Sequence, residues 1–383
     1  MLCRPLNHSQ TNGGSGLVTS APPTGILTNF NLDDESCNVT SRISSLVGRN
    51  LHLQPDHPIG IVKSMIEAYW KRRDDSFISV DDLSPIVSTT ANFDSLLVDA
   101  DHVSRSRSDT YYLTDDTVLR THMTCHDQEL LRMGHDRFLS TGDVYRRDDI
   151  DRSHYPVFHQ MDGVKMFSPD EPLPVVVDDL KDGLDGMVRD LFGDVEIRWG
   201  TDYFPFTDPS FELEINFEGK WLEVLGCGIL QPRVLSMAGR NEDEIGWAFG
   251  LGLERLAMVL FSIPDIRLFW TDDDRFRNQF RAGQVSKFQP YSKHPPCLKD
   301  VSFWAPEGFH QNDLNEVVRD VAGDLAEEVM LIDTFVHPKT NRLSNCFRIS
   351  YRAMNRSLTN EEVDQLQNQV REKIVSELDV ELR

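Results

Sequence analysis

Residues 142–163 read GDVYRRDDIDRSHYPVFHQMDG, a short polar turn between two runs with strand character. Arg146 can bind a phosphate through two parallel hydrogen bonds, and Phe158 offers a flat apolar face to a planar ring. The stretch therefore fits a site that holds a phosphate and a ring together. It fits equally well a hairpin tip whose charges are solvated, namely those of Asp148, Asp149, Asp151 and Arg152.

The totals set the first limits on fold and partners. The chain has 383 residues, of which 39% are hydrophobic, enough for two or three domains with a sizeable core. No apolar run approaches the roughly 20 residues of a membrane span, so we expect no membrane partner. The net charge of -23 argues against a nucleic-acid partner unless basic residues gather locally.

The cysteines and the first residues bear on the compartment. Six dispersed cysteines without a CxxC spacing predict free thiols in a reducing compartment and no metal site of the zinc type. Residues 1–32 contain no acid and one arginine, Arg4, among many Ser, Thr, Gly, Asn and Pro residues. This composition fits an organelle transit peptide or a disordered leader over residues 1–40.

Hydrophobic periodicity predicts an α+β domain over residues 41–270. Helices are expected over 57–70, with Pro58 at the start, 124–133 and 175–191. Strands are expected over 86–90, 138–145, 157–167, 195–199, 211–217 and 221–225, with a hairpin turn at Glu218-Gly219. Residues 247–261, WAFGLGLERLAMVLF, predict a helix entered from a glycine-rich loop.

A second unit follows a polar linker over residues 271–291. Its pattern predicts a strand, a helix, two strands and a helix over 302–304, 314–329, 329–336, 347–351 and 360–378. This is the element order of a ferredoxin-like module, which we place over residues 292–383.

Six segments resemble one known family and occur in that family's order. They are HPIG at His57, GDVYRRD at Gly142, HYPVFHQ at His154, YFPFTDPSFE at Tyr203, WLEVLGCG at Trp221 and GWAFGLGLERL at Gly246. From about Cys37 onward the chain resembles the single-chain mitochondrial type of phenylalanyl-tRNA synthetase. The resemblance implies a class II synthetase catalytic domain, built on an antiparallel β-sheet with flanking helices, and a ferredoxin-like anticodon-binding domain.

The implied activity is ATP-dependent formation of phenylalanyl-adenylate from L-phenylalanine and its transfer to tRNA(Phe), with Mg²⁺, in the mitochondrial matrix. A segment at 84–87 resembles the region that builds dimers in most class II enzymes, but the single-chain type is a monomer, which we expect here. Two other classes stay open. One is a paralogue that forms adenylates for an acceptor other than tRNA, and the other is a catalytically inactive RNA-binding or regulatory protein.

The resemblance assigns an ATP site. Arg146 and Arg255 would be catalytic: Arg146 would bridge the carboxylate and the α-phosphate, and Arg255 would stack adenine against Phe158. Glu223 would lie near the nucleotide and hold Mg²⁺, and if buried it would need a partner. The loop that contacts ATP phosphates and the tRNA end matches Ser153, His154 and Tyr155. Taken singly, Arg255, His154 and Glu223 also fit a surface arginine, a structural histidine and an ordinary strand carboxylate.

The resemblance also assigns a phenylalanine site. The residues are Phe204 and Phe206 at the phenyl ring, Ala248 and Phe249 at the pocket end, Gln160 and Asp162 near the ammonium, and His122 and Thr124 at the head group. Three positions depart from the family: Asp162 replaces the usual Glu, Thr124 the usual Ser, and Asp127 a usual Gln. The matched length holds no editing domain, so we expect tyrosine to be misactivated without proofreading.

The C-terminal unit carries a local basic segment. Residues 337–356 contain no acid and five Lys or Arg residues. Arg348, Ser350 and Arg352 share one strand face by the period of two, and Phe347 points to the core. The stripe predicts a contact with tRNA phosphates, although a solvated face balanced by helix acids would give the same pattern.

Overall fold

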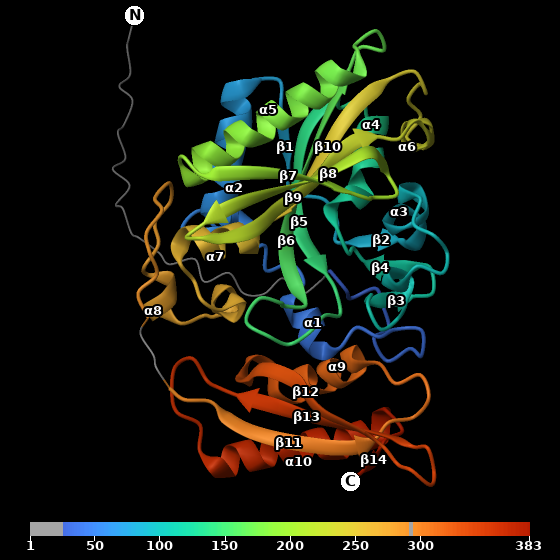
Figure 1. The fold of residues 1–383 in the computed structure, drawn as a ribbon, viewed down its shortest axis with the longest axis vertical. Helices are drawn as coiled ribbons and strands as arrows, with labels where there is room; N and C mark the ends of the chain where they lie inside the picture. Colours follow the sequence, from blue (N-terminus) through green and yellow to red (C-terminus); the bar gives the residue numbers. More distant parts are fainter. Residues whose placement is uncertain (1–25, 291–293) are drawn as a thin grey trace, which may run out of the picture.

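A computed structural model describes residues 26–290 and 294–383 and divides them into two domains (Figure 1). The larger one is built on a seven-stranded sheet with the strand order β1-β5-β6-β10-β9-β8-β7. The smaller, C-terminal one (orange to red in Figure 1) lies beneath it, with α9 at the boundary. The predicted fold class, an antiparallel catalytic sheet followed by a ferredoxin-like module, is confirmed.

The large sheet is antiparallel except at one edge. Its strands are β1 (Ile78–Val80), β5 (Arg137–Tyr145), β6 (Val157–Phe167), β7 (Glu196–Asp202), β8 (Thr207–Phe217), β9 (Lys220–Leu230) and β10 (Ile245–Gly252). Only β1 pairs in parallel, with β5. The hairpin turn falls at Glu218-Gly219 as predicted, with φ of 52° and 80°, the left-handed pair that a two-residue hairpin needs.

The sequence interpretation of residues 247–252 as a loop is wrong. They belong to β10, and α7 (Leu253–Phe261) begins only afterwards. Trp247, Phe249 and Leu251 alternate into the core, each at most 2% exposed. The intervening Ala248 and Gly250 obscure this alternation in the sequence. A half-buried strand is recognised by polar residues between the apolar ones, and these two small residues are not polar.

Helices cover the core face of this sheet. They are α2 (Pro58–Arg73), α5 (Leu173–Phe192) and α7. As predicted, α2 starts at Pro58, and the side chain of His57 caps it by accepting from the Ile59 amide at 3.2 Å. Trp70 of α2 stacks on Phe249 with ring centroids 5.4 Å apart, so the core side of β10 is closed.

Shorter elements complete the domain around the sheet. They are α1 (Ser41–Leu46), η1 (Leu51–Leu53), β2 (Ile86–Ser88), α3 (Thr89–Asn92), η2 (Asp94–Leu96), η3 (Val103–Arg105), β3 (Tyr112–Thr114), β4 (Thr117–Leu119), η4 (Met123–His126), α4 (Asp127–Arg132), α6 (Pro232–Met237), η5 (Ile266–Trp270) and α8 (Asp274–Arg277). The helix expected over 124–133 is thus split between η4 and α4. Among the described residues, no helix combines the length and apolar character needed to cross a bilayer.

Two expected boundaries shift. Leu27 and Val39 are buried in the main core, so packed chain begins before Ser41, while residues 1–25 lie outside the described ranges. Phe276, Phe280 and Phe288 of the expected linker also pack into that core. Aromatic side chains bury large areas, which ties this segment to the catalytic domain.

The C-terminal domain has the predicted element order. It comprises β11 (Cys297–Trp304), α9 (Gln311–Ala322), η6 (Gly323–Leu325), β12 (Ala326–Val336), β13 (Leu343–Tyr351), α10 (Asn360–Glu377) and β14 (Glu381–Leu382). Its sheet order is β12-β13-β11-β14. The helix expected to reach residue 329 ends at Ala322, because Gly323 turns the backbone to a φ of 54°.

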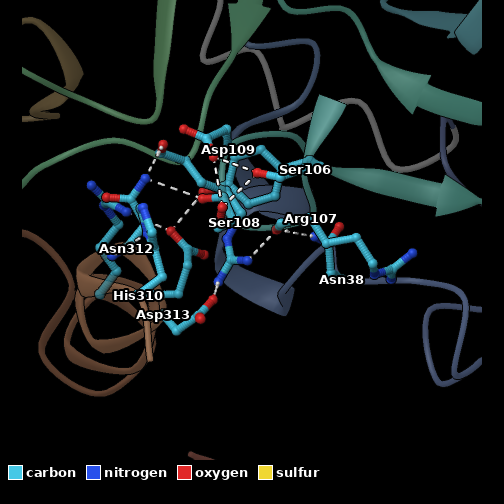
Figure 2. A network of polar contacts seen from close by, with 12 residues as sticks. Asn38, Ser106, Arg107, Ser108, Asp109, His310, Asn312 and Asp313 are labelled. Atoms are coloured by element: carbon cyan, nitrogen blue, oxygen red, sulfur yellow. Dashed lines mark hydrogen bonds and ion pairs between the residues drawn. The ribbon is translucent and has the colours of Figure 1, made fainter. Parts of the chain in front are cut away.

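The loop between β5 and β6 packs against the C-terminal domain. Asn312 of α9 donates to the carbonyls of Ser108 and Arg147 at 3.1 and 3.0 Å, and Arg147 pairs with Asp313 at 3.1 Å (Figure 2). Ile150 is buried in the C-terminal core.

The interpretation of a solvated tip is only partly right, because Asp149 and Arg152 are exposed while other groups of the loop are bound. Arg319 of α9 donates to the carbonyls of Asp148 and Asp149. Asp151 is tied to its own loop, where its carboxylate accepts from the backbone and the side chain of His154 at 2.8 and 2.7 Å.

Candidate active site

The face of β6 that points away from the helices carries three of the expected site residues. Phe158, Gln160 and Asp162 alternate along this face, while His159 and Met161 between them are fully buried on the core side. The strand therefore places a ring, an amide and a carboxylate in one row.

Small residues on the neighbouring strands form a floor beside this row. Gly250 of β10 stands opposite Asp162, and Gly226 of β9 stands opposite Gly250. Cross-strand partners share a face, so both glycines lie on the site side with Ala248. A Cβ on Gly226 would lie 2.5 Å from Cζ of Phe204, so only glycine lets that ring rest on the sheet. Phe206 stacks on Phe204 at 5.9 Å.

Arg146 follows β5 at the end of this row. Its Nε donates to the carbonyl of Thr121 at 2.8 Å, and its guanidinium lies 5.3 Å from the Phe158 ring centroid. Within the described ranges, no carboxylate forms an ion pair with it. Burial lowers the pKa of Arg146, and the charges of Asp148 and Asp162 offset only part of that effect. The result is a cation without a counterion.

The head-group residues meet across η4 and β6. Thr124 donates to Asp162 Oδ2 at 2.6 Å, and the amide of Met123 donates to Gln160 Oε1 at 3.3 Å. Burial raises the pKa of Asp162 to about 7, although Thr124 and Arg146 act in the opposite direction. Burial, followed by the charge of Arg146, lowers the pKa of His122 to about 3, so this imidazole is neutral.

Glu223 and Arg255 are joined at the far side of the face. Arg255 Nη1 lies 3.4 Å from a carboxylate oxygen of Glu223 and donates to its carbonyl at 3.2 Å. Both side chains are 56% exposed, so the argument that a buried Glu223 would need a partner does not apply. A β-bulge brings Glu223 to the site face, because Leu213 pairs with Leu225 but Glu214 with Glu223.

Acids gather around this bulge. Glu212 and Glu214 of β8 share the face of Glu223, and Arg198 pairs with Glu214 at 2.5 Å. Burial, with the charges of Glu214, Asp202 and Glu223, raises the pKa of Glu212. The negative potential at this place suits a divalent cation. No group of three or more metal-binding side chains occurs among the described residues, so the protein alone offers only a partial ligand set.

Two expected site residues lie elsewhere, and two stand apart. Phe249 faces the core, against Trp70 and Gly163, because it is out of phase with Ala248. Tyr155 is likewise out of phase with Phe158, and its hydroxyl donates to Asp324 of the C-terminal domain at 2.8 Å. Ser153 and His154 lie exposed at the loop tip, where the hydrogen bond to Asp151 raises the pKa of His154.

The basic stripe on β13 is partly neutralised. Arg348 makes two hydrogen bonds to Asp300, at 2.8 and 2.9 Å, on the surface. Arg352 pairs at 3.0 Å with Glu327, which is 2% exposed. Glu327 also lies 3.3 Å from Arg152 and 3.6 Å from Arg267, so Arg352 belongs to a cluster at the domain boundary.

Sequence reasoning missed two buried polar pairs beneath the site. His159 and Glu254 are joined at 2.7 Å, and Arg120 pairs with Asp143 at 2.8 Å. The available signals were a histidine and an acid at core-facing positions, next to Phe158 and Arg255. The sequence analysis also left the role of Asp127 open. This acid is buried at the start of α4.

Comparison with known proteins identifies this arrangement. A family model described as tRNA synthetases class II core domain (F) matches residues 45–280, and one described as Ferredoxin-fold anticodon binding domain matches residues 292–383. The fold is thus that of a class II aminoacyl-tRNA synthetase, and the chain belongs to that class. Within that class, the chain belongs to the organellar phenylalanine--tRNA ligases.

Three relatives carry this assignment over nearly the whole chain. The chloroplastic/mitochondrial phenylalanine--tRNA ligase of Arabidopsis thaliana is 55% identical, covering 92% of this chain and 84% of that protein. The mitochondrial enzymes of Mus musculus and Dictyostelium discoideum are 47% and 44% identical, covering 91% and 99% of this chain and 86% and 96% of theirs. The reaction is ATP-dependent ligation of phenylalanine to tRNA(Phe) for organellar translation.

Proposed function

We propose that Arg146 is the group on which phenylalanine and ATP meet. The supporting observation is its guanidinium, which has no carboxylate partner in the described chain, lies 5.3 Å from the Phe158 ring centroid and is influenced by the charge of Asp162. A carboxylate oxygen of phenylalanine attacks the α-phosphorus, and the bond to pyrophosphate breaks. Arg146 stabilises the charge on the pentacoordinate phosphorus, so catalysis requires positioning and charge rather than a side-chain nucleophile.

The nucleotide and the amino acid occupy opposite ends of the face. Adenine stacks between Phe158 and Arg255, and the contact with Glu223 at 3.4 Å holds the guanidinium in place. The phenyl ring lies against Phe204 and Phe206 over the floor of Gly226 and Ala248. An apolar pocket rejects an added hydroxyl by only about 100-fold, so tyrosine is activated at a low rate and its tRNA ester is not hydrolysed.

Mg²⁺ fits the acids near the bulge as an ion brought with ATP. Glu223, with Glu212 beside it, would bind it through carboxylate oxygens, and phosphate oxygens and water would complete the shell. When bound, the ion neutralises charge on the phosphates. The chain itself orients these carboxylates through the register shift and through Arg255.

The remaining proposals concern the wider setting. The enzyme acts as a monomer in the mitochondrial matrix. Arg348 releases Asp300 and binds a tRNA phosphate in its place. Ser153 and His154, at an exposed loop tip, contact the tRNA end rather than the ATP phosphates.

The test is phenylalanine-dependent exchange of pyrophosphate into ATP, followed by tRNA charging. Arg146→Lys keeps the charge but loses the planar fork, and we expect kcat of exchange to fall roughly 100-fold. Arg233→Lys, at an exposed position of α6, is the matched control. Exchange without charging would indicate an acceptor other than tRNA, and tRNA binding without exchange would indicate an inactive RNA-binding protein.

A further inference from the structure

Asn92 is a fully buried amide at the last residue of α3, a short helix that the proposed reaction does not use. Both polar atoms of its side chain bind the same residue, Thr121. Nδ2 donates to the Thr121 hydroxyl at 2.9 Å, and Oδ1 accepts from the Thr121 amide at 3.0 Å. Buried polar side chains complete their hydrogen bonds within the fold, so Asn92 holds Thr121 at two points.

Thr121 lies outside the regular elements, in the irregular segment between β4 and η4. Its backbone is therefore oriented neither by a helix nor by a sheet ladder. Its amide and its hydroxyl are held by Asn92, and one residue has only two soft backbone torsions, so this contact also sets the direction of the Thr121 carbonyl. That carbonyl accepts from Nε of Arg146 at 2.8 Å. Asn92 is thus connected to Arg146 through one intervening residue.

The bond from Arg146 to Thr121 sets the plane of the guanidinium. The backbone of Arg146 is fixed separately, because its amide donates to the carbonyl of Pro156 at 3.0 Å. Its long side chain can still turn about several bonds. Since a guanidinium is a rigid planar group, the hydrogen bond on Nε and the Phe158 ring 5.3 Å away together fix where the other donors lie. Those donors are the ones that the proposed function assigns to the carboxylate and the α-phosphate.

We propose that Asn92 is a positioning residue for the activation of phenylalanine, and that it acts on Arg146 through Thr121. The proposal rests on the proposed role of Arg146. Because that guanidinium stabilises charge that develops in the transition state, an error in its position lowers kcat more than it raises either KM. A displacement of about 1 Å can lower the rate of a reaction roughly 100-fold, so a contact two hydrogen bonds away has a measurable effect.

The experiment is a double-mutant cycle on the full-length chain, measured as kcat of phenylalanine-dependent pyrophosphate exchange. Asn92→Ala alone should lower kcat roughly 30-fold and change the KM for phenylalanine and for ATP less than about threefold. Arg146→Lys removes the Nε donor, so adding Asn92→Ala to it should lower kcat less than about threefold further. Thr90→Ala, at an exposed position of the same helix, is the matched control and should behave like the wild type.

The cycle separates positioning from a purely structural role. If Asn92 only stabilised the fold, its removal would lower kcat by the same factor whether or not Arg146 is present. Equal losses in the two backgrounds would therefore overturn the proposal, and so would an unchanged kcat in Asn92→Ala. A loss that appears in KM rather than in kcat would also contradict it, because Arg146 would then be well placed once both substrates are bound.

Thr121→Val tests the same connection if Asn92→Ala does not fold. It removes the hydroxyl that Asn92 binds and keeps the backbone amide and carbonyl. With one of the two hydrogen bonds lost, we expect kcat to fall roughly threefold to tenfold, and this loss should disappear in the Arg146→Lys background. A loss that persists there would overturn the proposal. Unimpaired exchange in Arg146→Lys alone would instead refute the proposed function, whatever the Asn92 variant does.

Discussion

Glu254 holds His159 by two hydrogen bonds, one from the backbone amide at 2.8 Å and one from the ring at 2.7 Å. Both side chains are buried. His159 precedes Gln160 and follows Phe158, and Glu254 precedes Arg255. The pair therefore fixes the first turn of α7 against β6 and sets the spacing of the two groups proposed to enclose adenine.

Glu254→Ala should loosen the contact between α7 and β6 and so disturb the spacing of Phe158 and Arg255. It leaves a buried amide and imidazole without their acceptor, so we expect a loss of roughly 2–4 kcal/mol in the free energy of unfolding. The KM for ATP should rise about tenfold, equivalent to roughly 1.4 kcal/mol, while the KM for phenylalanine changes less. Glu242→Ala, at an exposed acid, is the control. A parallel rise of both KM values would show that the pair supports the whole domain instead.

Gly142→Ala should destabilise the enzyme through Arg120. An added Cβ would lie 2.8 Å from Cζ of that buried guanidinium, which donates to the carbonyl and the carboxylate of Asp143. Disturbing a buried ion pair costs roughly 3 kcal/mol, and urea unfolding would measure it. Gly252→Ala, where nothing lies within 4 Å of the new methyl group, should cost less than about 1 kcal/mol. Similar losses in both variants would contradict this account.

The parts of the candidate site that could be predicted from the sequence are those that depend only on the alternation of side chains along one strand. The row of Phe158, Gln160 and Asp162 follows from alternation along one strand, and the ring of Phe204 lies against Gly226 on the same face of the sheet. The same rule, applied to Phe249 and Tyr155, would have removed both from the site. Ala248, next to Phe249, and Phe158, three residues after Tyr155, lie in the phase that faces the site.

Other features depend on contacts that no local pattern reveals. The bulge that turns Glu223 to the site face is a property of the pairing between β8 and β9. The docking of the 146–156 loop needs Arg319 and Asn312, more than 150 residues away. The sequence interpretation of that loop relied on its charged side chains. A sequence does not show which backbone carbonyls will accept hydrogen bonds from a helix far along the chain.

Arg348 and Arg352 should respond differently to charge reversal. Arg348 is exposed and faces Asp300, so Arg348→Glu should raise the KM for tRNA several-fold and leave pyrophosphate exchange intact. Arg352→Glu would face the buried Glu327, and we expect lower stability with both activities reduced. Arg233→Glu controls for the change in net charge. If Arg348→Glu charged tRNA normally, the stripe would serve only to balance nearby acids.

Asp162→Asn should stabilise the fold at neutral pH. A carboxyl whose pKa rises from 3.8 in the unfolded chain to about 7 in the fold binds more protons when folded. Its contribution to stability is therefore present below pH 4 and is lost as the pH rises to 7. Asn keeps an acceptor for Thr124 without this loss. The gain in unfolding free energy should be near zero at pH 4, grow to on the order of 3 kcal/mol by pH 7 and stay level above it. Urea unfolding at each pH would measure this difference, and Asp99→Asn, at an exposed position, should show none. A gain that does not change with pH would mean that Asp162 is already ionised in the fold.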